Sequence, residues 1–544
     1  MLNDLARIPR FIVDWVRPNI RTFMASRLPT VWSVAILLGL LVAIGAILFR
    51  QVIGWLQYPW LGVTGERIVQ AAVEAPWWMV LLAPMVGGAI VGQLLTRVME
   101  GRRAEGVADV MEAQALGLNR LTLGKGIWSA IISAVSLGSG ASSGREGPMV
   151  HLGATIAASI GRRFDLPGAA RRTLLGAGVA AAVSASFNAP IAGVVFAHEV
   201  ILGHYALSAF VPIVIAAVIG SVISRIYFGS YPAFIIPDYQ ITSYWEVPAF
   251  ALLGLTCAAV AIIFQMCLMG TDHVARRVTM PLWVRPIIGG FVIGVMGLWL
   301  PEILGVGYEA TDQALNQQLP LALMLVLIVA KTAATSITLA SRFGGGIFSP
   351  SLYLGAMTGG AFGIIAAQAF PELASSQGLY AILGMGAVSA AMLGAPFSTT
   401  LIVFELTGGY ALSLALLLSV SIASGLTQAI HGHSFFQWQL EARGLFLRDG
   451  PHKRIVRTIR VRDFVRNLES EAEAESVEIK DDDVTLTPFD TLEAALRAFD
   501  RAGVSRLPVV SPQEPKTIIG WALRVQALSV YNQALIDTSV EEHR

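Results

Sequence analysis

An arginine and a glutamate interrupt a stretch rich in glycine and proline, "GREGPMVH" at residues 144–151, within an otherwise apolar region. Gly147 followed by Pro148 is typical of a helix start, and the sequence predicts one there. The first turn of a helix carries unpaired N–H groups and the positive end of the helix dipole, which together attract anions. We therefore interpret Gly144, Arg145 and Gly147 as candidate anion-binding residues.

The carboxylate of Glu146 lies at this predicted helix start. A tethered carboxylate can occupy an anion site in place of a mobile anion, and it can leave that site when it is protonated. The residues therefore predict a gate at Glu146. A purely structural ion pair between Glu146 and Arg145 is the alternative that the sequence leaves open.

The chain contains an internal repeat. "GREGPMVHLGATIAASIG" at 144–161 and "GIFSPSLYLGAMTGGAFG" at 346–363 align at a constant offset, and "APIAGVVFAHE" at 189–199 aligns with "APFSTTLIVFE" at 395–405. Broken segments at matching positions in two halves are typical of a central binding site. The second copy predicts another helix start, near Ile347 and Phe348. Two helix starts aimed at one point would hold an anion by partial charges and could release it.

The composition of the 544 residues, 55% hydrophobic and only 14% charged, predicts an α-helical polytopic membrane protein rather than a soluble one. Interrupted backbone at membrane depth is tolerated where protein buries it or where it lines a wet cavity, so the Gly- and Pro-broken pieces indicate a transport path. Seven runs are long enough to cross a hydrocarbon core of about 30 Å, near residues 31–49, 77–98, 208–228, 247–271, 284–300, 320–340 and 411–430. Shorter, broken pieces lie near 124–137, 149–160, 171–186, 190–203, 349–366, 377–393 and 396–407.

Charged and special residues set further limits. The segment 1–30 carries five arginines before the first long apolar run, so the positive-inside rule places it in the cytoplasm. The net charge of +1, with no basic amphipathic face, indicates no nucleic-acid partner. Cys257 and Cys267 lie in one apolar run and are expected to pack as small hydrophobic residues. We expect no enzymatic activity, cofactor or metal.

Four blocks, in order, resemble the signature blocks of the CLC family of chloride channels and chloride/proton antiporters: residues 144–151, 187–199, 345–350 and 393–410. The resemblance covers residues 30 to 444. It implies a homodimer in the cytoplasmic membrane, with one chloride pathway per subunit, inverted repeats (halves 31–229 and 247–446 of a domain at 31–446), and Glu146 as the external gate. It also implies that the backbone N–H groups of Ile347 and Phe348 bind the anion, and that Phe436 replaces a central tyrosine without its hydroxyl.

Two departures from the family pattern bear on the mechanism. Glu105, in "AEGVAD" at 104–109, falls where the family has an anion-coordinating serine. An acidic side chain facing an anion would repel it unless it is protonated or turned away. Either the register differs or the central site is built without that side chain, and we expect the backbone at Gly106 and Val107 to bind the anion instead. Val200 falls where family antiporters carry an inner glutamate. Glu199 and its repeat mate Glu405 are expected to be structural. The resemblance then implies chloride/proton antiport gated by protonation of Glu146, with the proton arriving by water; a passive chloride channel is the alternative.

The chain becomes charged after residue 446. Residues 447–544 are expected to form a cytosolic tail with an acidic insert at 468–483 and one module at 456–530 that resembles a CBS module, entered at 461–465. The ribose-gripping positions of nucleotide-binding CBS modules fall at Leu523 and Gln526, which cannot do that work. We expect a structural or dimerising role, with a ligand-sensing tail as the alternative.

Overall fold

The computed structural model describes residues 8–229, 234, 236–237, 239–407, 412–445, 455–456, 459–468, 484–513 and 517–543. The chain divides into two compact units, Met1–Trp438 and Gln439–Arg544, which we describe separately. This division lies a few residues before the boundary predicted after residue 446. The predicted acidic insert at 468–483 lies, apart from its first residue, outside the described residues.

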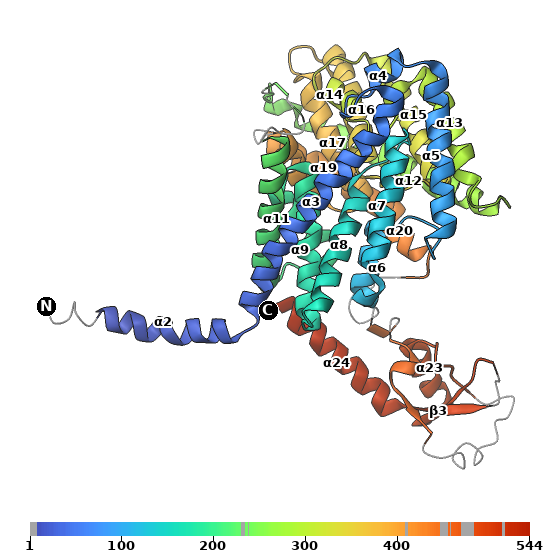
Figure 1. Cartoon of the computed structure of the whole chain (residues 1–544). Helices are drawn as coiled ribbons and strands as arrows, with labels where there is room; N and C mark the ends of the chain where they lie inside the picture. Colours follow the sequence, from blue (N-terminus) through green and yellow to red (C-terminus); the bar gives the residue numbers. More distant parts are fainter. Residues whose placement is uncertain are drawn as a thin grey trace. The chain divides into compact units, whose positions relative to one another are not determined.

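The first unit is built of helices joined by loops, and its described residues contain no β-strand (Figure 1). Its first half consists of α2 (Ile8–Ala25), α3 (Leu28–Leu61), α4 (Val69–Glu74), α5 (Trp77–Arg97), α6 (Val107–Leu116), α7 (Leu123–Gly138), α8 (Glu146–Arg163), α9 (Gly168–Phe187), α10 (Pro190–Phe196), the π-helical turn η2 (Ala197–Leu202) and α11 (Leu207–Phe228).

The second half begins after the segment that follows α11. It consists of α12 (Val247–Arg277), α13 (Arg285–Trp299), α14 (Tyr308–Leu315), α15 (Leu321–Ala340), α16 (Phe348–Ala369), α17 (Gln377–Leu393), α18 (Pro396–Thr407), α19 (Ser413–His431) and α20 (Phe435–Glu441). Helices α8 and α9 pack together in the first half and α16 and α17 in the second, so the corresponding segments of the two repeats make corresponding contacts.

Seven helical segments among the described residues are long and apolar enough to cross a membrane: Leu28–Leu61, Trp77–Arg97, Leu207–Phe228, Val247–Arg277, Leu321–Ala340, Phe348–Ala369 and Ser413–Glu441. Six of the seven predicted runs are among them. The predicted run at 284–300 instead forms the shorter α13, which ends before Pro301. The piece at 349–366, predicted to be interrupted, is the continuous α16. The expectation of a mostly helical polytopic membrane protein is confirmed.

Glycines allow α16 and α17 to approach to backbone contact. A Cβ atom at Gly359 would lie 2.0 Å from the carbonyl oxygen of Tyr380, and one at Gly384 would lie 2.4 Å from that of Gly355. Small residues at crossings of membrane helices permit this kind of close packing. The position of α16, and with it the start of that helix at Phe348, therefore depends on the absence of side chains at these crossings.

The second unit contains a three-stranded antiparallel sheet in the order β1 (Val465–Asn467), β3 (Ile518–Leu523) and β2 (Arg506–Val510). A parallel bridge joins Leu486 to Val509 of β2. Along the chain, helix α23 (Leu492–Ala502) lies between Leu486 and β2, and α24 (Arg524–His543) follows β3. The second unit has a hydrophobic core of its own, which includes Phe499.

Candidate functional site

The two predicted helix starts meet in the structure. The N–H of Gly144 donates to the carbonyl oxygen of Gly346 at 2.6 Å, and the N–H of Gly346 donates to the carbonyl oxygen of Gly144 at 2.8 Å. Helix α8 begins two residues after Gly144, and α16 begins two residues after Gly346. A Cβ atom at Gly144 would lie 3.1 Å from the carbonyl oxygen of Gly346, so glycine suits this approach. The predicted helix starts are confirmed, and the two repeats are joined at this point.

The side chain of Glu146 is buried where the two helices begin, with 2% of the residue exposed. Its Oε1 accepts hydrogen bonds from Ser349 Oγ at 2.5 Å and from Tyr308 Oη at 3.1 Å. Its Oε2 has no hydrogen-bond partner among the described residues. The carboxylate is thus held by two hydroxyl groups from the second half of the chain, while one of its oxygens remains unpaired.

Sequence reasoning missed both hydroxyl donors. Ser349 stands in the repeat block, directly before Pro350, so its position beside a helix start could have indicated a contact with Glu146. Tyr308 begins α14 and lies outside every block. Nothing in its local sequence indicates that its hydroxyl reaches a residue in the first half of the chain.

Arg145 is engaged by groups other than the gate. Its guanidinium forms an ion pair with Glu66, which also pairs with Arg50 at 2.8 Å, and it lies 4.9 Å from the centre of the Tyr308 ring. Its Nε is 3.9 Å from Glu146 Oε1, at the outer limit of an ion pair. The closer partner of Arg145 is therefore Glu66, which weakens the alternative that Glu146 serves only to pair with Arg145.

The other predicted anion-binding residues of the second half are buried. The ring of Phe348 packs against Phe187 and Phe196 at centroid distances of 4.9 and 6.2 Å. Ile347 precedes Phe348 at the start of α16, where the first N–H groups have no acceptor within the helix. Phe436, in α20, belongs to the same hydrophobic cluster as both. These positions are compatible with backbone N–H donors in an apolar environment. Their role in binding an anion stays a prediction.

The start of α6 differs from the expectation in one respect. The N–H of Gly106 donates to Asp109 Oδ2 at 2.9 Å, in a capping arrangement within its own helix. The N–H of Gly106 therefore already has an acceptor. Of the two predicted backbone donors, only the N–H of Val107 remains a candidate for binding the anion. Glu105 approaches the buried side chain of His151 in α8, its Oε2 lying 3.1 Å from His151 Nε2.

Glu199 and Glu405 each bind the start of a helix in the other half. The carboxylate of Glu199 accepts from the N–H groups of Phe397 and Ser398 at the start of α18, at 3.2 and 2.8 Å. That of Glu405 accepts from the N–H groups of Ile191 and Ala192 at the start of α10, at 3.1 and 2.7 Å. These reciprocal caps satisfy donors that a helix cannot satisfy itself. The neighbouring Val200 packs against the hydrophobic core.

We expect Glu199→Ala and Glu405→Ala each to destabilise the protein by about 2 kcal/mol, because hydrogen bonds to a charged group contribute roughly 1.5–3 kcal/mol. Thermal unfolding of the purified protein in detergent would measure the loss. Glu372→Ala, at an exposed position, serves as the control. Equal unfolding temperatures for all three variants would contradict a capping role.

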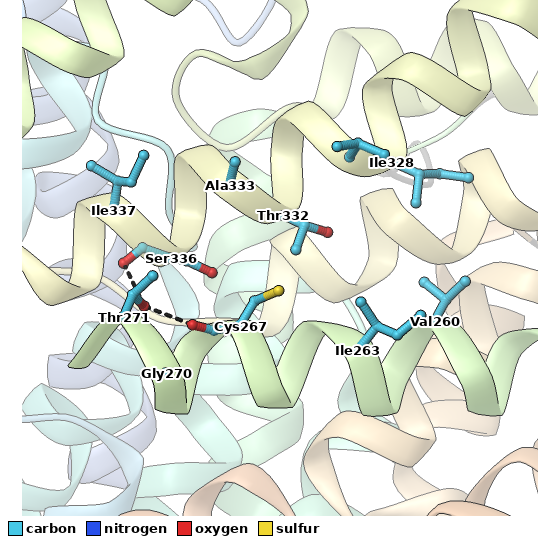
Figure 2. Close-up of a pocket in the computed structure, with 11 residues that line it drawn as sticks. Val260, Ile263, Cys267, Gly270, Thr271, Ile328, Thr332, Ala333, Ser336 and Ile337 are labelled. Atoms are coloured by element: carbon cyan, nitrogen blue, oxygen red, sulfur yellow. Dashed lines mark hydrogen bonds between the residues drawn. The ribbon is translucent and has the colours of Figure 1, made fainter. Parts of the chain in front are cut away.

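A cavity of about 550 Å³ lies between α12 and α15, away from these residues (Figure 2). Its lining is mainly apolar, and its polar contacts are internal: Thr271 Oγ1 donates to the carbonyl oxygen of Cys267 at 2.8 Å and lies 3.4 Å from that of Ser336. None of the predicted site residues lines it, and it carries no charged side chain. It is not the anion site.

Comparison with known proteins covers most of the membrane unit. Residues 87–428 match the family described as voltage gated chloride channel. A ClcB-like chloride channel protein of Ralstonia nicotianae is 32% identical over 391 residues, covering 71% of this chain and 91% of that protein. The H(+)/Cl(−) exchange transporter ClcA of Cronobacter sakazakii is 29% identical over 421 residues, covering 75% and 88%.

A solved structure gives the same result at the level of the fold. The crystal structure of a slow cyanobacterial Cl−/H+ antiporter superposes with a TM-score of 0.69 at 22% identity, covering 76% of this chain and 97% of that one. The match includes nearly all of the antiporter, so it accounts for the arrangement of the membrane helices. With its spanning helices, its paired repeats and these matches, the chain is a multi-pass membrane protein of the voltage gated chloride channel (CLC) family.

Proposed function

We propose that the protein moves chloride, or a similar small monovalent anion, across the membrane in exchange for protons, with Glu146 as the gate. The observation that carries this proposal is the buried Glu146 carboxylate, set where α8 and α16 begin and held by the hydroxyls of Tyr308 and Ser349. An ionised carboxylate occupies the place that suits an anion. Protonation removes its charge, so the side chain leaves and an anion can enter.

Simultaneous recording of chloride and proton movement tests this proposal. The pure protein would be reconstituted in liposomes under a chloride gradient with no proton gradient. The expected result is that protons move opposite to chloride, in fixed ratio to it, and so build up a proton gradient. Chloride movement with no linked proton movement would overturn antiport and leave Glu146 as the gate of a channel.

A passive chloride channel is the second candidate, and Val200 favours it. The position implied for an inner proton-accepting glutamate holds an apolar side chain packed against the core. The Ralstonia relative is also named a chloride channel protein. The liposome recording separates the two candidates, because a channel lets chloride run down its gradient without moving protons.

The assembly and the tail complete the proposal. We propose a homodimer in the cytoplasmic membrane with both ends of the chain in the cytoplasm. The order of the Leu486 bridge, α23, β2, β3 and α24 along the chain supports a CBS-like tail module. Leu523 ends β3 and Gln526 lies in the first turn of α24, and neither side chain offers the hydroxyl or carboxylate that would grip a ribose, which favours dimerisation over nucleotide binding. A shift in the unfolding temperature of the full-length protein with ATP or AMP would contradict this assignment.

Removal of either hydroxyl should loosen the gate. We expect Tyr308→Phe and Ser349→Ala each to raise chloride flux by up to about tenfold, because a hydrogen bond to a charged group contributes roughly 1.5–3 kcal/mol and each 1.4 kcal/mol is a factor of ten. Chloride efflux from liposomes measures the effect. Tyr353→Phe is the matched control, since the hydroxyl of Tyr353 has no hydrogen-bond partner among the described residues. Unchanged flux in both variants would remove these hydroxyls from the gate.

A further inference from the structure

His151 lies in α8, the helix that begins with the gate, and its side chain has no solvent exposure. Its Nε2 is 3.1 Å from Glu105 Oε2, but among the described residues neither ring nitrogen has a hydrogen bond of good geometry. Buried polar groups without partners are costly and uncommon in native proteins. A fully buried imidazole beside a carboxylate, with no good hydrogen bond among the described residues, is therefore a place where the protein can hold an extra proton.

Glu105 gives this site access to water, because 16% of its side chain is exposed. Its backbone N–H donates to Ser129 Oγ at 3.0 Å, which fixes the residue beside the start of α6. Helix α6 packs against both α8 and η2, and η2 carries Val200. Glu105 thus lies two residues before the start of a helix that adjoins both the gate helix α8 and the turn that carries Val200.

The surrounding charges are largely committed to other partners. On the α6 side, Arg103 binds both carboxylate oxygens of Asp109 and also attracts the carboxylate of Glu105, and Glu112 pairs with Arg120. The other elements packed against α8 are α3, α7, α9 and α16, and α16 carries no charged residue. In α3 the charged residue is Arg50, which pairs with Glu66, and in α7 it is Lys125, which pairs with Glu100. Helix α9 carries Arg171 and Arg172, and the side chain of Arg171 lies close to Gly161 of α8.

We propose that Glu105 and His151 form a proton-accepting pair that links proton uptake to anion binding at the start of α6. The proposal rests on the proposed antiport function. Without an extra proton the pair carries one negative charge beside the predicted donor Val107, and it repels an anion. One proton from hydronium, bound at the Glu105 carboxylate or at His151 Nε2, makes the pair neutral overall and lets the anion bind. One O–H bond of hydronium breaks as the new O–H or N–H bond forms, and water is released.

Histidine suits this role because its charge changes between about pH 5 and 8, the range in which a transporter works. The pair would supply, just before α6 and in α8, the inner proton acceptor that Val200 cannot provide. It would also explain why an acidic side chain is compatible with a nearby anion.

The test uses the full-length protein and two readouts. The first is coupled chloride and proton flux in liposomes for Glu105→Gln, His151→Gln and the unmodified protein. The second is the number of protons taken up when chloride binds, from calorimetric titrations in buffers of different ionisation enthalpy. Glu112→Gln, on α6, and His198→Gln, a second buried histidine, are the matched controls.

We expect both variants of the pair to lose proton coupling and to take up at least twofold fewer protons per chloride, while the two controls match the unmodified protein. Coupling and proton uptake that persist in both variants would overturn the pair and leave the proposed antiport standing. If the unmodified protein moves no protons in liposomes, the proposed antiport fails, and the calorimetric readout alone then decides on the pair. Proton uptake on chloride binding that is lost in both variants would support the pair. Proton uptake that is unchanged in both variants would overturn it.

Discussion

Glu146→Ala is expected to reduce proton movement to the background of empty liposomes while chloride still passes. The reason lies in the carboxylate, which accepts hydrogen bonds from the hydroxyls of Tyr308 and Ser349 and, in the proposed function, fills the anion site. Alanine removes both the tethered anion and the group that takes the proton. The site at the two helix starts then stays open to anions, and no carboxylate remains there to carry a proton.

Glu146→Gln refines the test, because the amide is neutral like a protonated carboxyl group. It should also pass chloride without protons. Glu246→Gln is the matched control: Glu246 is a buried carboxylate that accepts from Ser375 Oγ at 2.5 Å and Tyr380 Oη at 2.9 Å, far along the chain from either helix start. Its proton coupling should be retained. Proton-linked chloride flux in Glu146→Ala would rule out the gate assignment.

Local signals in the sequence predicted the starts of α8 and α16. Pro148 and Pro350 each fall in the first turn of a helix, where the missing N–H and the fixed backbone angle of proline cause no loss. Proline also explains why the predicted membrane span at 284–300 is the shorter helix α13. Pro301 follows Leu300 at the end of α13, and the residue before a proline is disfavoured in helical conformation.

The interruption predicted at 349–366 was wrong for a related reason. Its glycines were interpreted as breaks in the helix, whereas in α16 they are points of close contact with α17. Glycine lowers helix propensity by only about 1 kcal/mol, and packing in a membrane unit outweighs that cost. Local composition alone cannot distinguish a glycine that ends a helix from one that admits a neighbour.

The contacts that define the candidate site are not local. Tyr308 reaches Glu146 from the other half of the chain, and Glu105, just before α6, meets His151 in α8. Such pairs depend on how helices are placed, which no pattern within one segment encodes. The sequence placed the acidic side chain of Glu105 at a predicted anion site, and the structure shows that it lies beside His151. The repeat alignment was more informative for Glu199 and Glu405, because symmetry-related residues make related contacts.

Gly359→Ala is expected to destabilise the membrane unit by about 3 kcal/mol or more and to abolish chloride flux. A Cβ atom at this position would lie 2.0 Å from the carbonyl oxygen of Tyr380 and 3.0 Å from the Cα of Ala381, so two backbones rather than a flexible side chain must move apart. Inserting one carbon into a well-packed core typically costs about 1–3 kcal/mol, and a clash with backbone lies at the upper end.

The loss of transport should exceed what the lower stability explains, because α16 begins with Phe348 and any shift of this helix also moves its first N–H groups and Ser349. Thermal unfolding in detergent and chloride efflux at a temperature where the variant is still folded separate the two effects. Gly425→Ala in α19 is the matched control, since a Cβ atom there would meet nothing within 4 Å. It should be neutral or stabilise by up to about 1 kcal/mol, since alanine is the better helix former. Normal flux in folded Gly359→Ala would mean that the anion site tolerates movement of α16.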